Sequence, residues 1–397
     1  MSTSRALPPK RPILDWHRTA PSSATPLPCV ANLPYRQMTT SGRAAIYQAL
    51  RLIAAPAGST VLVPTYHCPT MVAPVVMLGL KPVFYPIDAL GLPALDRIPE
   101  HDAARATCLL APHYFGLTQS FAAVRDWCDR TNTLLIEDCA HAFYGMAGDH
   151  PVGAWGDYAT ASLTKFFPVF EGGMIASATR PIPSLNLRRP NFKAETKGLF
   201  DLVHLSNMHG RLKGFGPFIN ALTSRGLRSV RPPKALQQRT QQSRPYTEEF
   251  ALIECDLGRV DEAPLRSTHW IFAKEFKQNT GAYRRKLFEH YFGTLSNLPG
   301  ARPLYASLPP GAVPYAFPLW VDDADRVYHR LRLTGVPVYR WDKIWPGTPE
   351  IPEDCGLEWN THVLQLLCHQ NLLPAEIDWS IEMIRQTLNE TSPNHAR

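Results

Sequence analysis

The feature that most constrains the fold is a series of short apolar runs between residues 41 and 177, separated by stretches with helical spacing. The runs are residues 60–63, 82–85, 108–111 and 133–136, and the helical stretches are residues 42–54, 71–78 and 121–131. Short strands that are apolar on both faces and alternate with helices are typical of a mostly parallel sheet covered by helices. We therefore expect an α/β fold with a mostly parallel central sheet.

Ligands bind to such sheets beyond the carboxyl ends of the strands. The segments that follow the expected strands are residues 65–70, 113–116 and 138–141. These segments are the first places to look for a functional site.

The remainder of the chain predicts a second, smaller unit. Residues 270–292 have the pattern of one long helix, and residues 314–322, 325–333, 336–341 and 375–388 suggest strand, helix, strand and helix. We expect an extended and poorly ordered N-terminal arm at residues 1–37, a large α/β domain at 38–250 and a small C-terminal α+β domain at 251–397.

A basic segment lies at residues 180–250. It holds thirteen Lys and Arg against four Asp and Glu, a net charge of +9 in a chain whose total is +7. Such a region attracts anionic partners, so contact with an acidic carrier or a membrane surface remains open. Residues 214–222 suggest a basic amphipathic helix, which would lie on a membrane or pack on the protein. Nucleic acid is not expected, because no nucleic-acid-binding module is visible.

Membrane spans, secretion and metal binding find no support in the composition. The longest apolar runs are far shorter than the roughly 20 residues that a membrane-spanning helix needs, and the N-terminal residues lack the apolar core of a signal peptide. The eight cysteines are scattered, without the spacing of a metal site or a disulfide framework. We expect a cytoplasmic protein, with peripheral membrane attachment as the alternative, and no bound metal.

Lys165 is the most informative candidate residue. It lies among Leu, Phe and Pro, and small hydroxyl residues precede it. Burial in such surroundings lowers the pKa of a lysine and makes its neutral amine available for Schiff-base formation. Ser162 could then bind a phosphate of the same ligand. The alternative is a surface lysine in a Ser/Thr-rich loop.

Two further segments suggest how a ligand would be held. Asp138 follows a buried strand, where a carboxylate needs a cation such as the ring nitrogen of pyridoxal phosphate; magnesium or ribose would also fit. Ser41 and Gly42 precede a helix, whose free N–H groups favour a phosphate, although Ser before a helix is also an ordinary N-cap.

In this order, these segments resemble the DegT/StrS-type sugar aminotransferases, a family of fold-type I pyridoxal phosphate enzymes. The resemblance is clear over residues 38–177 and looser beyond. It rests on residues 41–45, 63–66, 81–84, 112–116, 137–141, 153–157 and 165 with 171–173. The resemblance implies the fold-type I architecture, pyridoxal 5′-phosphate as cofactor and a homodimer with shared active sites.

The resemblance also implies roles for individual residues. Lys165 would bind the cofactor covalently and move the proton, Asp138 would hold the ring nitrogen, and His141 would lie near the ring hydroxyl. The phosphate would be bound by Ser162 and by the main-chain N–H groups at the helix start, those of Gly42, Arg43 and Ala44. Thr160 would be a weaker phosphate contact.

The sequence departs from the family pattern around the substrate. Cys68 stands where many relatives carry an aromatic residue, so the thiol, Tyr66 or His67 would cover the cofactor ring. The segment that relatives send across the dimer interface is not recognisable, and Arg266 or Trp270 could take its place. The substrate candidates are Arg340, which could grip a carboxylate, and Tyr66, His113 and Arg266.

The expected function is transfer of an amino group from an amino acid, glutamate in the first instance, to a carbonyl of a larger anionic acceptor such as a nucleotide-linked keto-sugar. A carrier- or lipid-linked ketone or aldehyde is an alternative acceptor. A second hypothesis is another reaction at Cα, such as decarboxylation. The third is a non-catalytic, cofactor-binding regulatory protein.

Overall fold

The computed structural model describes residues 6–16, 26–212, 214 and 246–391. Its larger sheet has seven strands in the order β1-β9-β8-β5-β4-β2-β3. In chain order they are β1 (Tyr35–Thr39), β2 (Thr60–Pro64), β3 (Lys81–Tyr85), β4 (Ala106–Pro112), β5 (Leu134–Asp138), β8 (Tyr158–Ser162) and β9 (Gly173–Ser177). Strands β3, β2, β4, β5 and β8 run parallel, whereas β9 is antiparallel to both of its neighbours, β8 and β1. The expected mostly parallel α/β sheet is confirmed.

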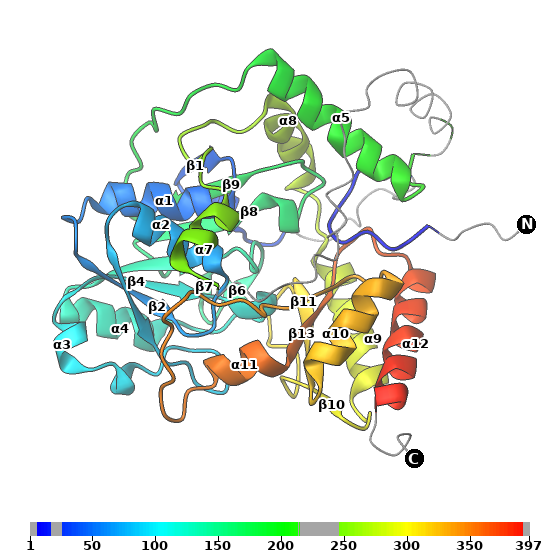
Figure 1. Cartoon of the computed structure of the whole chain (residues 1–397). Helices are drawn as coiled ribbons and strands as arrows, with labels where there is room; N and C mark the ends of the chain where they lie inside the picture. Colours follow the sequence, from blue (N-terminus) through cyan, green and yellow to red (C-terminus); the bar gives the residue numbers. More distant parts are fainter. Residues whose placement is uncertain (1–5, 17–25, 213, 215–245, 392–397) are drawn as a thin grey trace, which may run out of the picture.

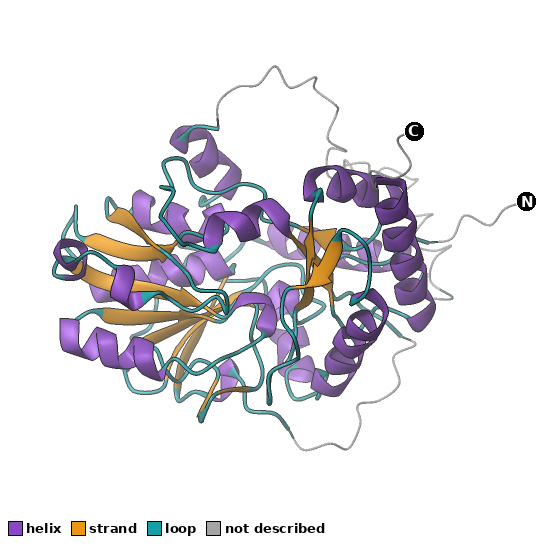
Figure 2. Ribbon diagram, turned by 90° about the horizontal axis from the view of Figure 1, so that it is seen from below, coloured by secondary structure: helices purple, strands orange, loops and turns teal. Residues whose placement is uncertain are grey.

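Helices cover both faces of this sheet (Figures 1 and 2). Helices α1 (Gly42–Ile53), α2 (Pro69–Met77) and α7 (Glu248–Cys255) lie on one side, and α3 (Glu100–Ala103) and α4 (Ala122–Thr131) lie on the other. Each helix lies within two or three residues of the range that its sequence pattern predicts, where one was predicted. The short hairpin β6 (Met146–Ala147) and β7 (His150–Pro151) connects β5 to β8.

A second sheet of four antiparallel strands lies beside the carboxyl ends of the parallel strands, in the order β10-β11-β13-β12 (Figure 1). The strands are β10 (Ala301–Pro303), β11 (Ala316–Val321), β12 (Val338–Tyr339) and β13 (Val363–Leu367). The helices of this part of the chain are α9 (Gly281–Leu295), α10 (Ala324–Thr334), α11 (Gly356–His362) and α12 (Pro374–Thr391). Helices α9 and α10 pack on the sheet, and α12 packs on both of them.

The prediction of one long helix at residues 270–292 is wrong. The segment holds two helices, α8 (Arg266–Glu275) and α9, with a break at residues 276–280. The Oδ1 atom of Asn279 accepts a hydrogen bond from the N–H of Gly281 at 3.0 Å. Asparagine side chains that bond the backbone locally compete with helical hydrogen bonds, so the apolar spacing alone overestimated this helix.

The basic segment contains one long helix that the sequence analysis did not predict, α5 (Phe192–Met208), which packs on α8 (Figure 1). The expected amphipathic helix at 214–222 lies, apart from residue 214, outside the described residues. None of the described helices combines the length and the apolar character that crossing a membrane would require.

The N-terminal residues 6–16 form no helix or strand, but they pack on the protein. The Nε2 atom of His369 bonds the carbonyl of Pro9 at 2.9 Å, and the Oδ1 atom of Asn371 accepts from the N–H of Ile13 at 3.3 Å. Ile13 is 1% exposed. The expectation of poor order is therefore wrong for these residues, because main-chain bonds and burial fix them where no helix or strand does.

Candidate active site

A cavity of about 500 Å³ lies where the parallel strands end and the second sheet begins. Residues from both sheets and from the N-terminal arm line it. The segments that follow β2, β4 and β5 all contribute, because the carboxyl ends of parallel strands meet at one edge of a sheet.

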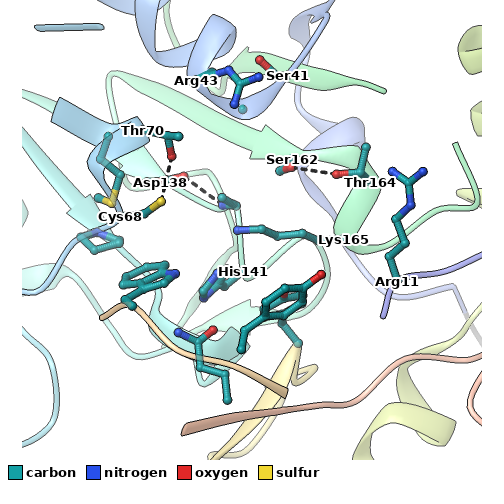
Figure 3. Close-up of a pocket in the computed structure, with 18 of the residues that line it drawn as sticks. Arg11, Ser41, Arg43, Cys68, Thr70, Asp138, His141, Ser162, Thr164 and Lys165 are labelled. Carbon is teal, nitrogen blue, oxygen red and sulfur yellow. Dashed lines mark hydrogen bonds between the residues drawn. The ribbon is translucent and has the colours of Figure 1, made fainter. Parts of the chain in front are cut away.

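Lys165 reaches into this cavity from a short turn, residues Leu163–Lys165, that directly follows β8 (Figure 3). Burial lowers the pKa of Lys165, and the nearby Asp138 carboxylate opposes that shift. The Nζ atom lies 5.3 Å from the centre of the Tyr315 ring. The surroundings thus favour a neutral amine more than water does, as the sequence suggested.

Asp138 is the last residue of β5 and lies in the same cavity. Its Oδ1 atom accepts hydrogen bonds from the N–H of Ala140 at 2.9 Å and from the Oγ1 of Thr160 at 3.2 Å. Burial raises the pKa of Asp138, while Lys165 and these hydrogen bonds hold it down. The carboxylate is fixed in place and lacks a cation in direct contact within the described residues.

His141 forms part of the cavity wall between two aromatic rings. Its ring centre lies 4.4 Å from that of Tyr315 and 5.0 Å from that of Trp341. The Nδ1 atom accepts a hydrogen bond from the N–H of Phe115 at 3.2 Å, so the proton of the neutral ring is on Nε2. Burial, and secondarily Lys165, place the pKa of His141 well below its usual value. His141 is therefore a neutral hydrogen-bond donor.

The start of helix α1 supplies N–H groups to the cavity. Ser41 caps the helix by accepting from the N–H of Ala44 at 3.2 Å, and the next two residues, Gly42 and Arg43, line the cavity together with Ser162. Ala44, expected to bind phosphate, does not line the cavity. A helix start with free N–H groups next to a hydroxyl suits a phosphate.

Two glycines allow this close approach. A Cβ atom on Gly42 would lie 3.3 Å from the Cβ of Ser162, and one on Gly173 would lie 2.1 Å from the carbonyl oxygen of Ser41. The second distance is impossible for a real side chain, so residue 173 must be glycine for α1 to begin where it does. Thr160, the weaker phosphate candidate, instead bonds Asp138 and lies outside the cavity wall.

Of the three residues considered as covers for the cofactor ring, only Cys68 lines the cavity. The Oγ1 of Thr70 donates to its Sγ at 3.1 Å (Figure 3). Tyr66 is fully buried behind Trp341, with ring centres 4.9 Å apart. His67 is also fully buried, where its Nε2 accepts from the N–H of Trp345 at 2.8 Å.

Two of the four substrate candidates, Arg340 and His113, border the cavity, but both side chains already have partners in the protein. Arg340 borders the cavity, but its guanidinium donates to the carbonyls of Asn360 and Thr361 and pairs with Asp325. A guanidinium committed in this way has little left to offer a substrate carboxylate. Arg266 lies at the start of α8, outside the cavity wall, where its N–H bonds Glu195.

His113 borders the cavity, yet its Nε2 lies 2.9 Å from the Oε1 of Glu137, and its ring stacks on Phe121. His113, Glu137 and Cys139 lie close enough to hold a metal ion. The Glu137 oxygens, however, already accept from three main-chain N–H groups, those of Gly153, Trp155 and Gly156. We assign this cluster a structural role, because its acceptors are used to fix the loop before β8.

Four residues at or near the site escaped the sequence analysis: Arg11, Tyr315, Gln365 and Arg284. The first three line the cavity. Arg284, fully buried in α9, donates to the main-chain carbonyl of Lys165 at 3.1 Å and so holds the turn that carries the lysine. No local pattern marks these residues, since each reaches the site through contacts between distant parts of the chain.

The arrangement fits pyridoxal 5′-phosphate. The cavity contains an amine with a lowered pKa, a fixed carboxylate without a direct cationic contact, and a helix start that suits a phosphate. These are the three groups that the aldehyde, the ring nitrogen and the phosphate of this cofactor need.

Comparison with known proteins points the same way. Residues 35–182 match the model of the DegT/DnrJ/EryC1/StrS aminotransferase family. A GDP-perosamine synthase of Vibrio cholerae is 30% identical over 155 residues, which cover 38% of this chain and 42% of that protein. A dTDP-4-dehydro-2,3,6-trideoxy-D-glucose 4-aminotransferase of Saccharopolyspora spinosa is 27% identical, over 42% of this chain and 44% of that protein. The matches thus span less than half the length of these relatives.

Solved structures extend the likeness to most of the chain at the level of the fold. DesV of S. venezuelae, solved in complex with a ketimine intermediate, aligns with a TM-score of 0.61 and 17% identity over 91% of this chain and 86% of that one. NtdA of Bacillus subtilis, solved with bound cofactor PMP, aligns with a TM-score of 0.57 and 16% identity over 90% and 74%. The expected fold class is confirmed.

Proposed function

We propose that this chain, whose residues 35–182 belong to the DegT/DnrJ/EryC1/StrS aminotransferase family, is a pyridoxal phosphate-dependent aminotransferase. The observation that carries the proposal is the meeting of Lys165, Asp138 and the start of α1 in one cavity (Figure 3). The reaction moves an amino group from an amino acid to a carbonyl of a second substrate.

Each residue of the site has a role that follows from its position in the cavity. Ser162 and the N–H groups of Gly42 and Arg43 bind the phosphate, while the Asp138 carboxylate keeps a proton on the ring nitrogen. When bound, the cofactor withdraws electrons from the substrate Cα. The neutral amine of Lys165, which burial favours, would hold the aldehyde end of the cofactor and would be placed to take a proton from the substrate Cα.

The remaining wall residues orient these groups. His141 presents its Nε2–H while the Phe115 N–H occupies Nδ1. Arg284 holds the carbonyl of Lys165, and Thr160 and Ala140 hold the Asp138 carboxylate. Orientation of this kind lowers the barrier because the groups need not be ordered during the reaction.

For the substrates, we propose glutamate as donor and a nucleotide-linked keto-sugar as acceptor. The names of several relatives support this choice, since they act on dTDP- or UDP-linked sugars, and one is an oxoglutarate aminotransferase. We also propose a homodimer, supported by apolar side chains exposed on α5 and α8, among them Phe192 and Trp270.

The absorbance spectrum of the protein incubated with pyridoxal phosphate tests this function. We expect a near-visible band from the lysine-bound cofactor, absent in Lys165→Ala and retained in Lys286→Ala, a control lysine exposed on α9. Adding L-glutamate should convert the band to that of the amine form.

A band that no amino acid discharges would contradict transamination and favour another reaction at Cα. The absence of any band would contradict the cofactor assignment itself.

A further inference from the structure

The N-terminal arm, residues 6–16, crosses the edge of the cavity and is anchored on both sides of it. His369 bonds the carbonyl of Pro9, and Tyr339 donates to the carbonyl of Lys10 at 3.4 Å. Beyond the cavity, Ser206 of α5 accepts from the N–H of Leu14 at 3.0 Å. The arm is thus held in place by both the second sheet and the long helix of the basic segment.

Three arm residues line the cavity, Lys10, Arg11 and Pro12, and Figure 3 shows the side chain of Arg11 there. In this view its guanidinium lies near Thr164, on the side of Lys165 away from Asp138 and Cys68. Among the described residues, the Arg11 side chain donates one hydrogen bond, from Nη1 to the carbonyl of Phe170 at 3.3 Å. A guanidinium has five N–H groups, so most of its donor capacity remains for a ligand.

No carboxylate of the described residues pairs with Arg11. The two acidic residues of the cavity wall are Asp138 and Glu171, and Glu171 is already paired with Arg259. Burial lowers the pKa of Arg11, and Lys10, the neighbouring wall residue, adds a second cation. A partly desolvated cation without a counter-charge is costly, which suggests that the missing anion comes with the substrate.

We propose that Arg11 binds an oxyanion of the substrate, in the place that the sequence analysis gave to Arg340. The inference rests on the proposed function, because the oxyanion is either the carboxylate of the amino donor or the phosphate of the carbonyl acceptor. A guanidinium recognises both groups bidentately. The arm holds the guanidinium of Arg11 at the wall of the cavity that Lys165 also lines.

Two binding measurements on the cofactor-loaded protein test the proposal and separate the two sources. Inorganic pyrophosphate stands for the acceptor phosphate, and calorimetry measures its binding. L-glutamate stands for the donor carboxylate, and the concentration that gives half of the maximal discharge of the cofactor band measures its binding. We expect Arg11→Gln to weaken one of them by about ten- to hundred-fold, the usual effect of losing a charged hydrogen bond.

Arg11→Lys keeps the charge and should recover part of the affinity. Arg332→Gln is the matched control, since it removes the same charge from an exposed residue near Lys10 that does not line the cavity. Equal binding of both probes to Arg11→Gln and to the unchanged protein would overturn the proposal. So would loss of the cofactor itself from Arg11→Gln, because the arginine would then serve the cofactor phosphate. The cofactor band of the unchanged protein reports on the proposed function separately.

Discussion

Asp138 and Lys165 influence each other across the cavity, although no hydrogen bond joins them directly. Each is buried, and each shifts the pKa of the other toward the charged form. Burial and charge therefore act in opposite directions on both groups, and the balance suits a cofactor that brings one cation and one aldehyde into the same space.

Replacement of Asp138 by Asn keeps the shape of the side chain and removes its charge. We expect the glutamate-driven step to slow by about 10²- to 10³-fold, the usual cost of losing one electrostatic partner in an active site. Stopped-flow absorbance of the cofactor-loaded protein measures this rate. Thr160→Val, which removes only one hydrogen bond from the carboxylate, should have a much smaller effect. Equal rates for Asp138→Asn and the unchanged protein would exclude the proposed role of Asp138.

The buried His67 should make the free energy of unfolding depend on pH. Burial lowers its pKa from 6.5 to about 4, while the unfolded chain keeps the ordinary value. As the pH falls below 6.5, the unfolded chain binds this proton first, so the free energy of unfolding decreases until about pH 4. Over this range His67 accounts for a loss of about 3 kcal/mol.

Urea unfolding at pH 7 and pH 4.5 measures this loss. In His67→Gln, where residue 67 no longer titrates, the difference between the two pH values should be smaller. An unchanged difference would show that His67 titrates normally in the folded protein. His290→Gln, at an exposed histidine, is the matched control and should keep the full difference.

At the scale of elements, the first turn of α1 depends on its contact with β9. The contact requires Gly173, because a Cβ there would lie 2.1 Å from the carbonyl of Ser41. We expect Gly173→Ala to move the start of α1 and to weaken cofactor binding by at least about ten-fold, since two phosphate-binding N–H groups would shift. Titration with pyridoxal phosphate measures the affinity.

Gly293→Ala provides the comparison. Gly293 lies within α9, and a Cβ on it would meet no atom within 4 Å. Alanine favours a helix over glycine, so this variant should be stabilised by about 0.5–1 kcal/mol and bind the cofactor as before. If both glycine variants bind the cofactor normally, the position of α1 does not control the phosphate site.

Elements with strong local signals were predictable. The apolar strands β2, β4 and β5 and the capped helix α1 lie close to their predicted ranges, because a few neighbouring residues determine each of them. Helices α8 and α9 were merged in the prediction, since the apolar spacing did not reveal the break at residues 276–280, where the side chain of Asn279 accepts from the N–H of Gly281. The short strand β12 was predicted too long, because pairing with β13 limits it to two residues.

The site residues also differ in how far the neighbouring sequence predicted them. Asp138 ends strand β5 and Lys165 lies just after β8, so their sequence neighbours already suggested that they would meet. Arg340 was a candidate because an arginine can grip a carboxylate, but Asp325 and two carbonyls of the α11 region occupy its guanidinium. Arg11 could not be inferred, because the bonds that place its arm join residues more than 350 positions apart.

At the scale of the whole molecule, helices α5 and α8 leave large apolar side chains in solvent. Phe192 is 83% exposed and Trp270 is 60% exposed. We expect light scattering to give twice the chain mass of 44.4 kDa. The double variant Phe192→Asp, Trp270→Asp should shift the protein toward the monomer, because charge is unfavourable in a buried interface. Leu333→Asp, at an equally exposed residue of α10, should leave the mass unchanged. A monomeric unchanged protein would contradict the proposed dimer.

The anchoring of Pro9 by His369 has a consequence for the order of events during synthesis. The ribosome makes Pro9 of the arm 360 positions before its partner His369. The large sheet can form long before that point, yet the cavity wall that Arg11 completes cannot. The groups assigned to the cofactor all precede residue 166, so emerging chains should be able to form that part of the site first, and the substrate side of the cavity should be completed only after residue 369 has left the exit tunnel.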